Sequence, residues 1–187
     1  MRRRDREMDK EFGFKIIDCS RYGVLSMIDK ENLPYGLPLS MVRDGNAIYF
    51  HSANEGKKVE VLKTNSKVAI TFVGEVRVPE NYSYDELEAM KDDPSKAVKF
   101  ISSVFTTEFE SALVKGEAEI IEDEEEKIYA MKLICEKYTP SKMEYFSAAI
   151  GAGISRTRVY KIEIQDISAK RKKYDEKGVE MKWGRID

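Results

Sequence analysis

The feature that most constrains the fold is a series of short apolar runs separated by turn sequences. "YGVLSMI" (22–28), "YGLPLSMV" (35–42) and "AIYFHS" (47–52) have the length and β-branched or aromatic content of strands. "DKENL" follows the first run, and "RDGN" (43–46), with the Asp-Gly pair typical of tight hairpin turns, follows the second. The pattern predicts three antiparallel strands that follow one another as a meander.

Pro38 limits where the second of these strands can lie. Proline has no backbone N–H to donate to a neighbouring strand, so it is found on edge strands or at bulges. We therefore predict that the strand around Pro38 lies at an edge of the sheet or is bulged there. Either arrangement leaves nearby backbone groups free for another partner.

The rest of the chain continues this mixture of strands and helices. Together the segments predict a mainly β, α+β fold, an antiparallel split β-barrel with helical additions, in a single domain 1–187. Strands are expected at 67–74, at 106–121 with a bend at Gly116, and at 157–167; helices at 5–18, 55–65 and 122–138; a helical insertion at 76–104; and a C-terminal tail at about 169–187.

Composition excludes several classes of function. The net charge of −2 gives no general affinity for nucleic acid or anionic membranes, and the basic stretches "MRRRDR" and "KRKK" (170–173) are expected to be solvated ends of the chain. No apolar run reaches the roughly 20 residues that span a bilayer, and no secretory signal is apparent, so we expect a cytoplasmic protein. One histidine with Cys19 and Cys135 does not supply the usual four ligands of a structural zinc site.

The segment "SANEGKK" has the form of an anion site. Small residues end a predicted strand just before a predicted helix, where unpaired N–H groups and the positive end of the helix dipole favour a phosphate. Ser52 adds a hydroxyl, Ala53 and Gly56 keep the backbone accessible, and Lys57 and Lys58 add positive charge. A polar loop with two solvated lysines is the alternative that the segment by itself leaves open.

Several motifs in a fixed order resemble a known family. They are "MRRRDREM", "YGVLSMID", "PYGLPLSMV", "DGNAIYFHSANEGKKVEVLKTNSKVAITFVG", "FTTEFESALVKGEAEII" and "EDEEEKIYAMKLICEKY". From Arg2 to about Ile167 the chain resembles the nitroimidazole-resistance group of the pyridoxamine 5'-phosphate oxidase-related, FMN-binding split-barrel proteins. The block "YFHSANEGKK" is the most specific part of this resemblance.

The resemblance implies a homodimer of split barrels with FMN in clefts between the subunits. Lys57 and Lys58 match the basic pair that holds the FMN phosphate. The other positions that it assigns to the cofactor are Pro38, Leu39 and Ser40 along the flavin, His51 and Ser52 beside the ring and ribityl chain, and Ser111 at a polar position that reaches the flavin.

Two features depart from the family pattern, and the C-terminal "KWGRID" resembles the tryptophan and arginine near the end of true pyridoxamine oxidases. The segment Val76–Val104 is longer than in compact members, and we expect it to cover the cleft or to pack on the partner subunit. Glu108 stands where related sequences often carry a basic residue, and with Glu110 it is expected on a solvated strand face. Trp183, in the final "KWGRID", is expected to cover the barrel or a dimer contact.

The resemblance implies an FMN-dependent oxidoreductase that reduces a nitroaromatic, nitroimidazole-like or similar small acceptor, with NADH or NADPH as electron donor. His51 is the one candidate catalytic residue, as a proton or hydrogen-bond donor, and packing of its ring beside the flavin is the alternative role. Two other functions stay open: a non-catalytic barrel that stores or senses FMN, FAD or haem, and a pyridoxamine-phosphate oxidase-like enzyme.

Overall fold

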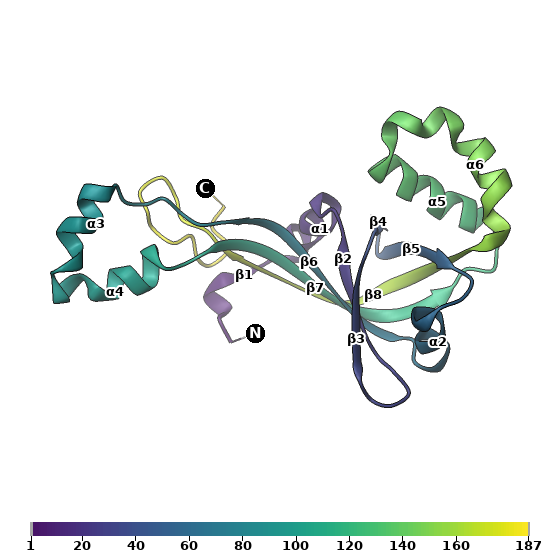
Figure 1. Ribbon diagram of the computed structural model, residues 1–187, viewed down its shortest axis with the longest axis horizontal. Coiled ribbons are helices and arrows are strands. Elements are labelled where there is room, and N and C mark those ends of the chain that lie inside the picture. Colours follow the sequence, from purple (N-terminus) through teal and green to yellow (C-terminus); the bar gives the residue numbers. More distant parts are fainter. Residues whose placement is uncertain (1, 187) are drawn as a thin grey trace.

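The protein is an α+β fold built on one antiparallel sheet. The computed structural model describes residues 2–186, for Ala97 the backbone only (Figure 1). The main path of the sheet has the strand order β3-β2-β6-β7-β8-β5-β4, and β1 pairs with β8 off this path. The strands are β1 (Glu7–Met8), β2 (Gly23–Ile28), β3 (Pro34–Leu39), β4 (Val42–Asp44), β5 (Ala47–Ala53), β6 (Lys67–Arg77), β7 (Glu108–Ile120) and β8 (Thr157–Lys172).

Helices occupy the connections between strands. The predicted helices near 5–18, 55–65 and 122–138 are present, and α5 begins where the Asp123 side chain accepts a hydrogen bond from the Glu126 N–H at 2.8 Å. The helices are α1 (Lys10–Cys19), α2 (Lys57–Thr64), α3 (Tyr84–Lys91), α4 (Ala97–Lys99), α5 (Glu124–Tyr138) and α6 (Phe146–Gly153), with a π-helical turn at Phe100–Val104. None of those in the described part of the chain is long and apolar enough to cross a lipid bilayer.

The predicted meander is wrong in its third strand. β2 and β3 form the expected hairpin and β3 is an edge strand, as Pro38 requires, but β5 pairs with β4 and β8. The chain leaves β3 at Met41, whose N–H donates to the Tyr138 hydroxyl at 2.9 Å and whose carbonyl accepts from it at 2.8 Å. Tyr138 of α5 thus provides hydrogen-bond partners for the Met41 backbone N–H and carbonyl. At this point the chain crosses from one edge of the sheet to the other and starts β4 there.

The core fills the inside of the curved sheet. Alternate residues of six strands point inward, among them Leu25, Phe50 and Phe72, which are fully or almost fully buried. Ile16 and Ile17 of α1 and residues of α2 join this cluster. A second, smaller cluster on the outside of the sheet packs α5 against β4, β5 and β8. The arrangement leaves the end of β5 and the start of α2 at a rim of the barrel.

The long strands β7 and β8 differ in part from the prediction. The expected bend at Gly116 is confirmed, because the β7–β8 register shifts between Lys115 and Gly116, where a Cβ would lie 2.3 Å from the Glu163 carbonyl oxygen. β8 runs to Lys172, so the predicted end at 167 and tail from 169 are wrong. The apparently solvated "KRKK" lies mostly within this strand, and Arg171 is only 4 % exposed.

The connection between β6 and β7, residues 78–107, is called the arm below. β6 continues to Arg77, beyond the expected start of the insertion at about 76, and the helical part begins at Tyr84, in the helix-forming stretch from Ser83 onward. Figure 1 shows α3 and α4 at the far end of β6 and β7, on the opposite side of the molecule from α2, α5 and α6. The arm is therefore held away from the barrel.

Both ends of the chain meet near the base of the arm. Arg6 forms an ion pair with Glu180 at 2.5 Å, and the Trp183 N–H donates to the Asp5 carbonyl at 2.8 Å. In the basic N-terminal stretch, Arg3 and Arg6 are thus ion-paired, while Arg2 and Arg4 are exposed as expected. Trp183 is 75 % exposed and does not cover the barrel, and its role in a dimer contact stays a prediction.

Glu108 is buried, which corrects the expectation that it lies on a solvated strand face. It is 3 % exposed, pairs with the Arg77 guanidinium and accepts the Tyr174 N–H at 2.7 Å. Burial by itself would raise the pKa of Glu108, but these two hydrogen bonds to the carboxylate outweigh burial and lower the pKa. The carboxylate therefore joins β6, β7 and the C-terminal segment at the base of the arm.

Candidate functional site

The β5–α2 corner consists of residues 52–58 with Arg158 and Tyr160 of β8. Its turn depends on Gly56, which has φ +123° and precedes the first residue of α2. No side chain caps α2, and a Cβ built on Gly56 would meet nothing within 4 Å. The N-terminal end of α2 thus has N–H groups without a side-chain acceptor beside open space, which favours an anion.

Two neighbouring strands place polar groups at this corner. Ser52 lies directly opposite Arg158, and Phe50 directly opposite Tyr160. Residues opposite one another point to the same face of a sheet, so these four side chains share the inner face. The rings of Phe50 and Tyr160 stack with centroids 4.8 Å apart, and the Lys58 Nζ lies 5.6 Å from the Phe50 centroid. Lys58 and Arg158 are therefore brought to one rim of the barrel.

Two cationic side chains of the corner have no carboxylate paired with them. Among residues 2–186, neither Lys58 nor Arg158 forms an ion pair, and the Arg158 Nη1 and the Tyr160 Oη are buried without a hydrogen-bond partner. Burial lowers the pKa of Lys58 and raises that of Tyr160, and Arg158 and Ser52, which lie near the Tyr160 hydroxyl without a well-formed hydrogen bond to it, partly offset the rise. Buried polar groups of this kind ordinarily have partners, so the donor set is suited to an anion with several oxygen atoms.

Arg158 and Tyr160 are functional candidates that the sequence analysis missed. Both lie in "TRVYKIEI", where alternation predicts the strand but does not reveal its neighbour. The alternation alone does place both on one face. Their place beside Ser52 follows from the pairing of β5 with β8, which the predicted meander did not contain.

Lys57 points in a different direction from Lys58. Its Nζ lies 3.5 Å from the Asp29 carboxylate and 4.8 Å from the centroid of Tyr35, both on the β2–β3 hairpin. Asp29 also accepts the backbone N–H groups of Leu33 and Glu31, each at 3.0 Å, and with Lys57 these lower its pKa. Lys57 is more than half exposed, so its long side chain is free to turn toward a ligand at the α2 N-terminus.

His51 lies at the same corner but on the other face of β5. It pairs with Val159, its side chain alternates with that of Ser52, and it is exposed. Neighbouring groups exclude water from part of the His51 ring, and this desolvation lowers the pKa of His51 below its ordinary 6.5. The positive charge of Lys58 lowers it further. The imidazole is therefore neutral at pH 7, where it donates a hydrogen bond rather than a proton from an imidazolium.

Of the other predicted cofactor residues, Ala53 lies in the corner, whereas Pro38, Leu39 and Ser40 lie apart from it. Ala53 ends β5 beside Ser52, whose hydroxyl donates to the Ala53 carbonyl at 2.7 Å. Pro38, Leu39 and Ser40 line a surface cavity of about 560 Å³ together with Arg21, Tyr22 and Val24. The structure therefore brings together Ser52, Ala53, Lys57 and Lys58, with His51 on the reverse face, and leaves Pro38–Ser40 as a separate group.

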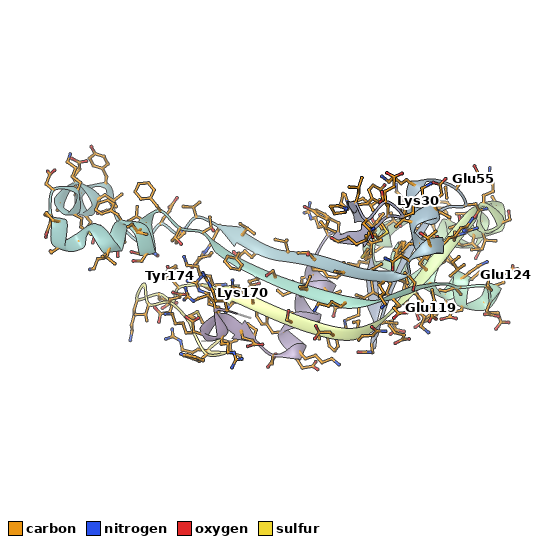
Figure 2. All side chains as sticks on the ribbon, turned by 90° about the horizontal axis from the view of Figure 1, so that it is seen from below. Lys30, Glu55, Glu119, Glu124, Lys170 and Tyr174 are labelled. Atoms are coloured by element: carbon orange, nitrogen blue, oxygen red, sulfur yellow. The ribbon has the colours of Figure 1, made fainter. Side chains whose placement is uncertain are left out.

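Ser111 forms a third location. It lies opposite Val73 of β6 and Lys170 of β8. Figure 2 shows Lys170 and Tyr174 toward the arm, far from Glu55 at the corner. Along β8, Lys170 and Arg158 are separated by roughly 40 Å of extended strand, so Ser111 and the corner of one subunit do not contact the same flavin.

Ser111 and Pro38 do share the outer face of the sheet. An uncharged line of side chains crosses five strands on this face, and none of them is buried. We call it the outer row; it consists of Pro38, Val24, Thr71, Leu113 and Ser168, paired in that order. Ser111 is two residues from Leu113 and therefore borders the outer row.

The comparisons with known proteins agree with this fold. The family model described as pyridoxamine 5'-phosphate oxidase matches residues 9–171. A candidate 5-nitroimidazole antibiotic resistance protein from Bacteroides thetaiotaomicron has 26 % identity and a TM-score of 0.66, over 87 % of this chain and 84 % of that one. Among curated proteins, none matches the chain.

Two further solved structures share the fold at lower identity. A FAD-binding protein from Mesorhizobium loti has 17 % identity and a TM-score of 0.59, over 90 % of this chain and 98 % of that one. A FAD and haem binding protein from Mycobacterium smegmatis has 15 % identity and a TM-score of 0.65, over 89 % and 73 %. With the family model matching most of its length, the chain belongs to the pyridoxamine 5'-phosphate oxidase family.

Proposed function

We propose that the protein is an FMN-dependent oxidoreductase whose β5–α2 corner holds the FMN phosphate. One observation carries the proposal: two cationic side chains, Lys58 and Arg158, lie at this corner without an ion-pair partner among the described residues, near the uncapped start of α2. Leaving the buried Nη1 of Arg158 without a partner is unfavourable, and a phosphate would supply an acceptor for it. The likeness to flavin-binding neighbours supports the same cofactor class.

The residues present fit a terminal phosphate. Ser52 and Arg158 face it from the paired strands, Lys58 from the first turn of α2, and the N–H groups after Gly56 point out of the helix. Lys57 reaches it by leaving Asp29. The lysines at the start of a helix are unfavourable by themselves, and a dianion removes that conflict.

When bound, the isoalloxazine supplies the redox chemistry, with NADH or NADPH as donor and a nitroaromatic or similar small molecule as acceptor. The protein binds and orients the cofactor and the acceptor and shields them from water. We assign Pro38–Ser40 to contact with the ring system and His51 to a hydrogen bond with the acceptor. Because His51 is neutral at pH 7, it stabilises charge on the acceptor through its ring N–H.

We further propose that the cofactor lies between two subunits. Pro38 belongs to the outer row and Ser111 borders it, and the uncharged and only partly covered side chains of this row suit contact with the same surface on a second copy. Within one subunit Ser111 is too far from the corner to share a ligand with it. A two-fold pair would let the corner of one subunit and Ser111 of the other contribute to one cleft.

Analysis of the ligand released from the purified native protein tests the proposal. We expect flavin absorption bands and the mass of FMN, bleaching by NADH or NADPH, and recovery of colour with a nitroimidazole. The mass of FAD would change the cofactor assignment, and a Soret band would favour haem binding. Formation of pyridoxal phosphate would favour the oxidase activity, and bound flavin without turnover would favour storage or sensing.

Arg158→Ala should weaken FMN binding by about 10- to 100-fold, because it removes a charged hydrogen bond to the phosphate. Arg156→Ala is the matched control: Arg156 is exposed and donates to the Ala152 carbonyl at the end of α6. Fluorescence titration of each apoprotein with FMN and with riboflavin measures the affinity of both variants for the two ligands. Equal losses for FMN and riboflavin would contradict a phosphate contact.

His51→Ala should retain FMN and lower turnover by about 100-fold, since the acceptor loses a hydrogen-bond donor. The wild-type rate should change with an inflection below pH 6.5, as the lowered pKa of His51 requires, and the variant should lack it. Steady-state kinetics across pH 5–8 with parallel flavin absorbance provide the measurement. Loss of the flavin from His51→Ala would instead assign His51 to cofactor binding.

A further inference from the structure

The arm exposes a group of large apolar side chains. Soluble proteins rarely leave a contiguous apolar patch of more than a few hundred Å² in contact with water unless the patch is an interaction site. The side chains are Val78 (66 % exposed), Tyr84 (75 %), Val98 (73 %), Ile101 (75 %) and Phe105 (80 %). Such exposure, gathered in one segment, predicts that another surface covers it.

The base of the arm fixes its direction. The Tyr174 hydroxyl donates to the Ser102 carbonyl at 2.7 Å, and the Tyr82 and Ser103 hydroxyls lie 3.2 Å apart. Lys172 of β8 donates to the Thr106 hydroxyl. Together with the buried Glu108 beneath it, these contacts hold the arm pointing away from its own barrel (Figure 1).

The arm does not cover the β5–α2 corner of its own chain. α2 lies at the other end of the molecule, and Figure 2 shows the same separation between Tyr174, at the base of the arm, and Glu55, at the corner. This argues against a lid closing over the same subunit's phosphate site. The surface that covers the arm must belong to another molecule.

The exposed area is on the scale of a dimer interface. An aromatic side chain buries about 150–250 Å² when covered, so Tyr84 and Phe105 alone leave roughly 250–400 Å² available. Val78, Val98 and Ile101 add to this. A standard interface takes about 800 Å² from each partner, and a two-fold pair would bury two identical arms. The arm therefore supplies a large part of one side of such an interface.

We propose that the arm packs against a second copy of this chain and, with the outer row, forms the dimer interface. This inference rests on the proposed homodimer and specifies what the arm does in it. Thr71 and Leu113, two members of the outer row, lie on β6 and β7, the strands that carry the arm, so one partner can contact both surfaces. In this dimer the arm binds the partner subunit, and its contacts hold the two halves of the cofactor cleft together.

Replacement of two arm side chains tests the inference. Ile101→Ser with Phe105→Ser should raise the dimer dissociation constant by at least about 30-fold, since each replacement removes apolar area from the interface. Leu33→Ser with Val179→Ser is the matched control, because these side chains are 55 % and 54 % exposed outside the arm. Sedimentation velocity on a dilution series, with flavin absorbance of the same samples, gives association and cofactor content together.

The outcomes separate the arm from the proposed function. All four side chains are exposed in the single chain, so circular dichroism and melting temperature should match the wild type. A dimer that both double variants leave unchanged would overturn the role of the arm and leave the flavin function intact. A flavin-loaded wild type that stays monomeric would overturn the inference, whereas a dimer without flavin would overturn the proposed function.

Discussion

The Lys57→Ala/Lys58→Ala double variant is expected to lose FMN while keeping its fold. Each lysine supplies a charged hydrogen bond or close charge to the phosphate, and two such interactions correspond to about two to four orders of magnitude in affinity. Neither side chain belongs to the core of the barrel: Lys57 is exposed, and Lys58 lies along the Phe50 ring at the rim. Titration of the apoprotein with FMN and a thermal melt measure both consequences.

A matched pair of lysines separates the phosphate effect from a loss of general positive charge. Lys63→Ala with Lys67→Ala removes the same charge from the end of α2 and the start of β6, where both side chains are exposed. This control should bind FMN as the wild type does. Unchanged flavin occupancy in the Lys57/Lys58 variant would rule out the assignment of the phosphate to this corner.

The single variants Lys57→Ala and Lys58→Ala should weaken FMN binding to different extents. Lys58 lies over the Phe50 ring, two residues along β5 from Ser52, and has no ion-pair partner among the described residues, whereas Lys57 must leave Asp29 to reach the phosphate. Breaking the ion pair of Lys57 with Asp29 offsets part of what Lys57 gains from the phosphate. Lys58→Ala should therefore account for most of the loss in the double variant.

Local sequence patterns predict most helices and strands well, because the buried residues of the core recur along the chain with the spacing of each helix or strand. Leu25 and Phe72 alternate with residues that are less buried, so a period of two marks β2 and the first part of β6, whereas β5 is marked by a continuous apolar run, since 47–50 are all buried. The bend at Gly116 and the edge position of Pro38 also follow from single residues whose backbone chemistry is restrictive. These predictions need no knowledge of which strands are neighbours.

Pairing between distant strands is where the sequence reasoning failed. The Tyr138 hydroxyl holds the Met41 backbone across almost a hundred residues, and this contact carries the chain from β3 to β4. The sequence gives no sign of this contact, so the predicted meander placed β5 beside β3. Arg158 could therefore not be placed opposite Ser52. The lysines at 57 and 58 were found because their signal is local, whereas Arg158 depends on a pairing that no local pattern contains.

Glu108 illustrates a second limit, since an acidic residue in an alternating strand gives no sign that it is buried. Its partners come from β6 and from the start of the C-terminal segment, neither of which is near it in the sequence. Glu108→Ala should destabilise the protein by about 3 kcal/mol, because the buried Tyr174 N–H loses its acceptor and Arg77 loses its counter-charge. For a chain of this length the loss corresponds to roughly 6–12 °C in melting temperature.

The same carboxylate should contribute to the acid sensitivity of the fold. The hydrogen bonds from Arg77 and the Tyr174 N–H hold the pKa of Glu108 below its ordinary 4.5, against the effect of burial. A depressed pKa in the folded state stabilises the protein above the unfolded-state pKa, and this stabilisation is lost as pH falls through the folded-state pKa. Glu108→Gln should therefore reduce the drop in melting temperature between pH 6 and pH 3, whereas Glu119→Gln, an exposed residue of the same strand, should leave it unchanged. Equal pH dependence in the wild type and Glu108→Gln would show that the pair with Arg77 does not stabilise the fold, and that the base of the arm is held by its other contacts.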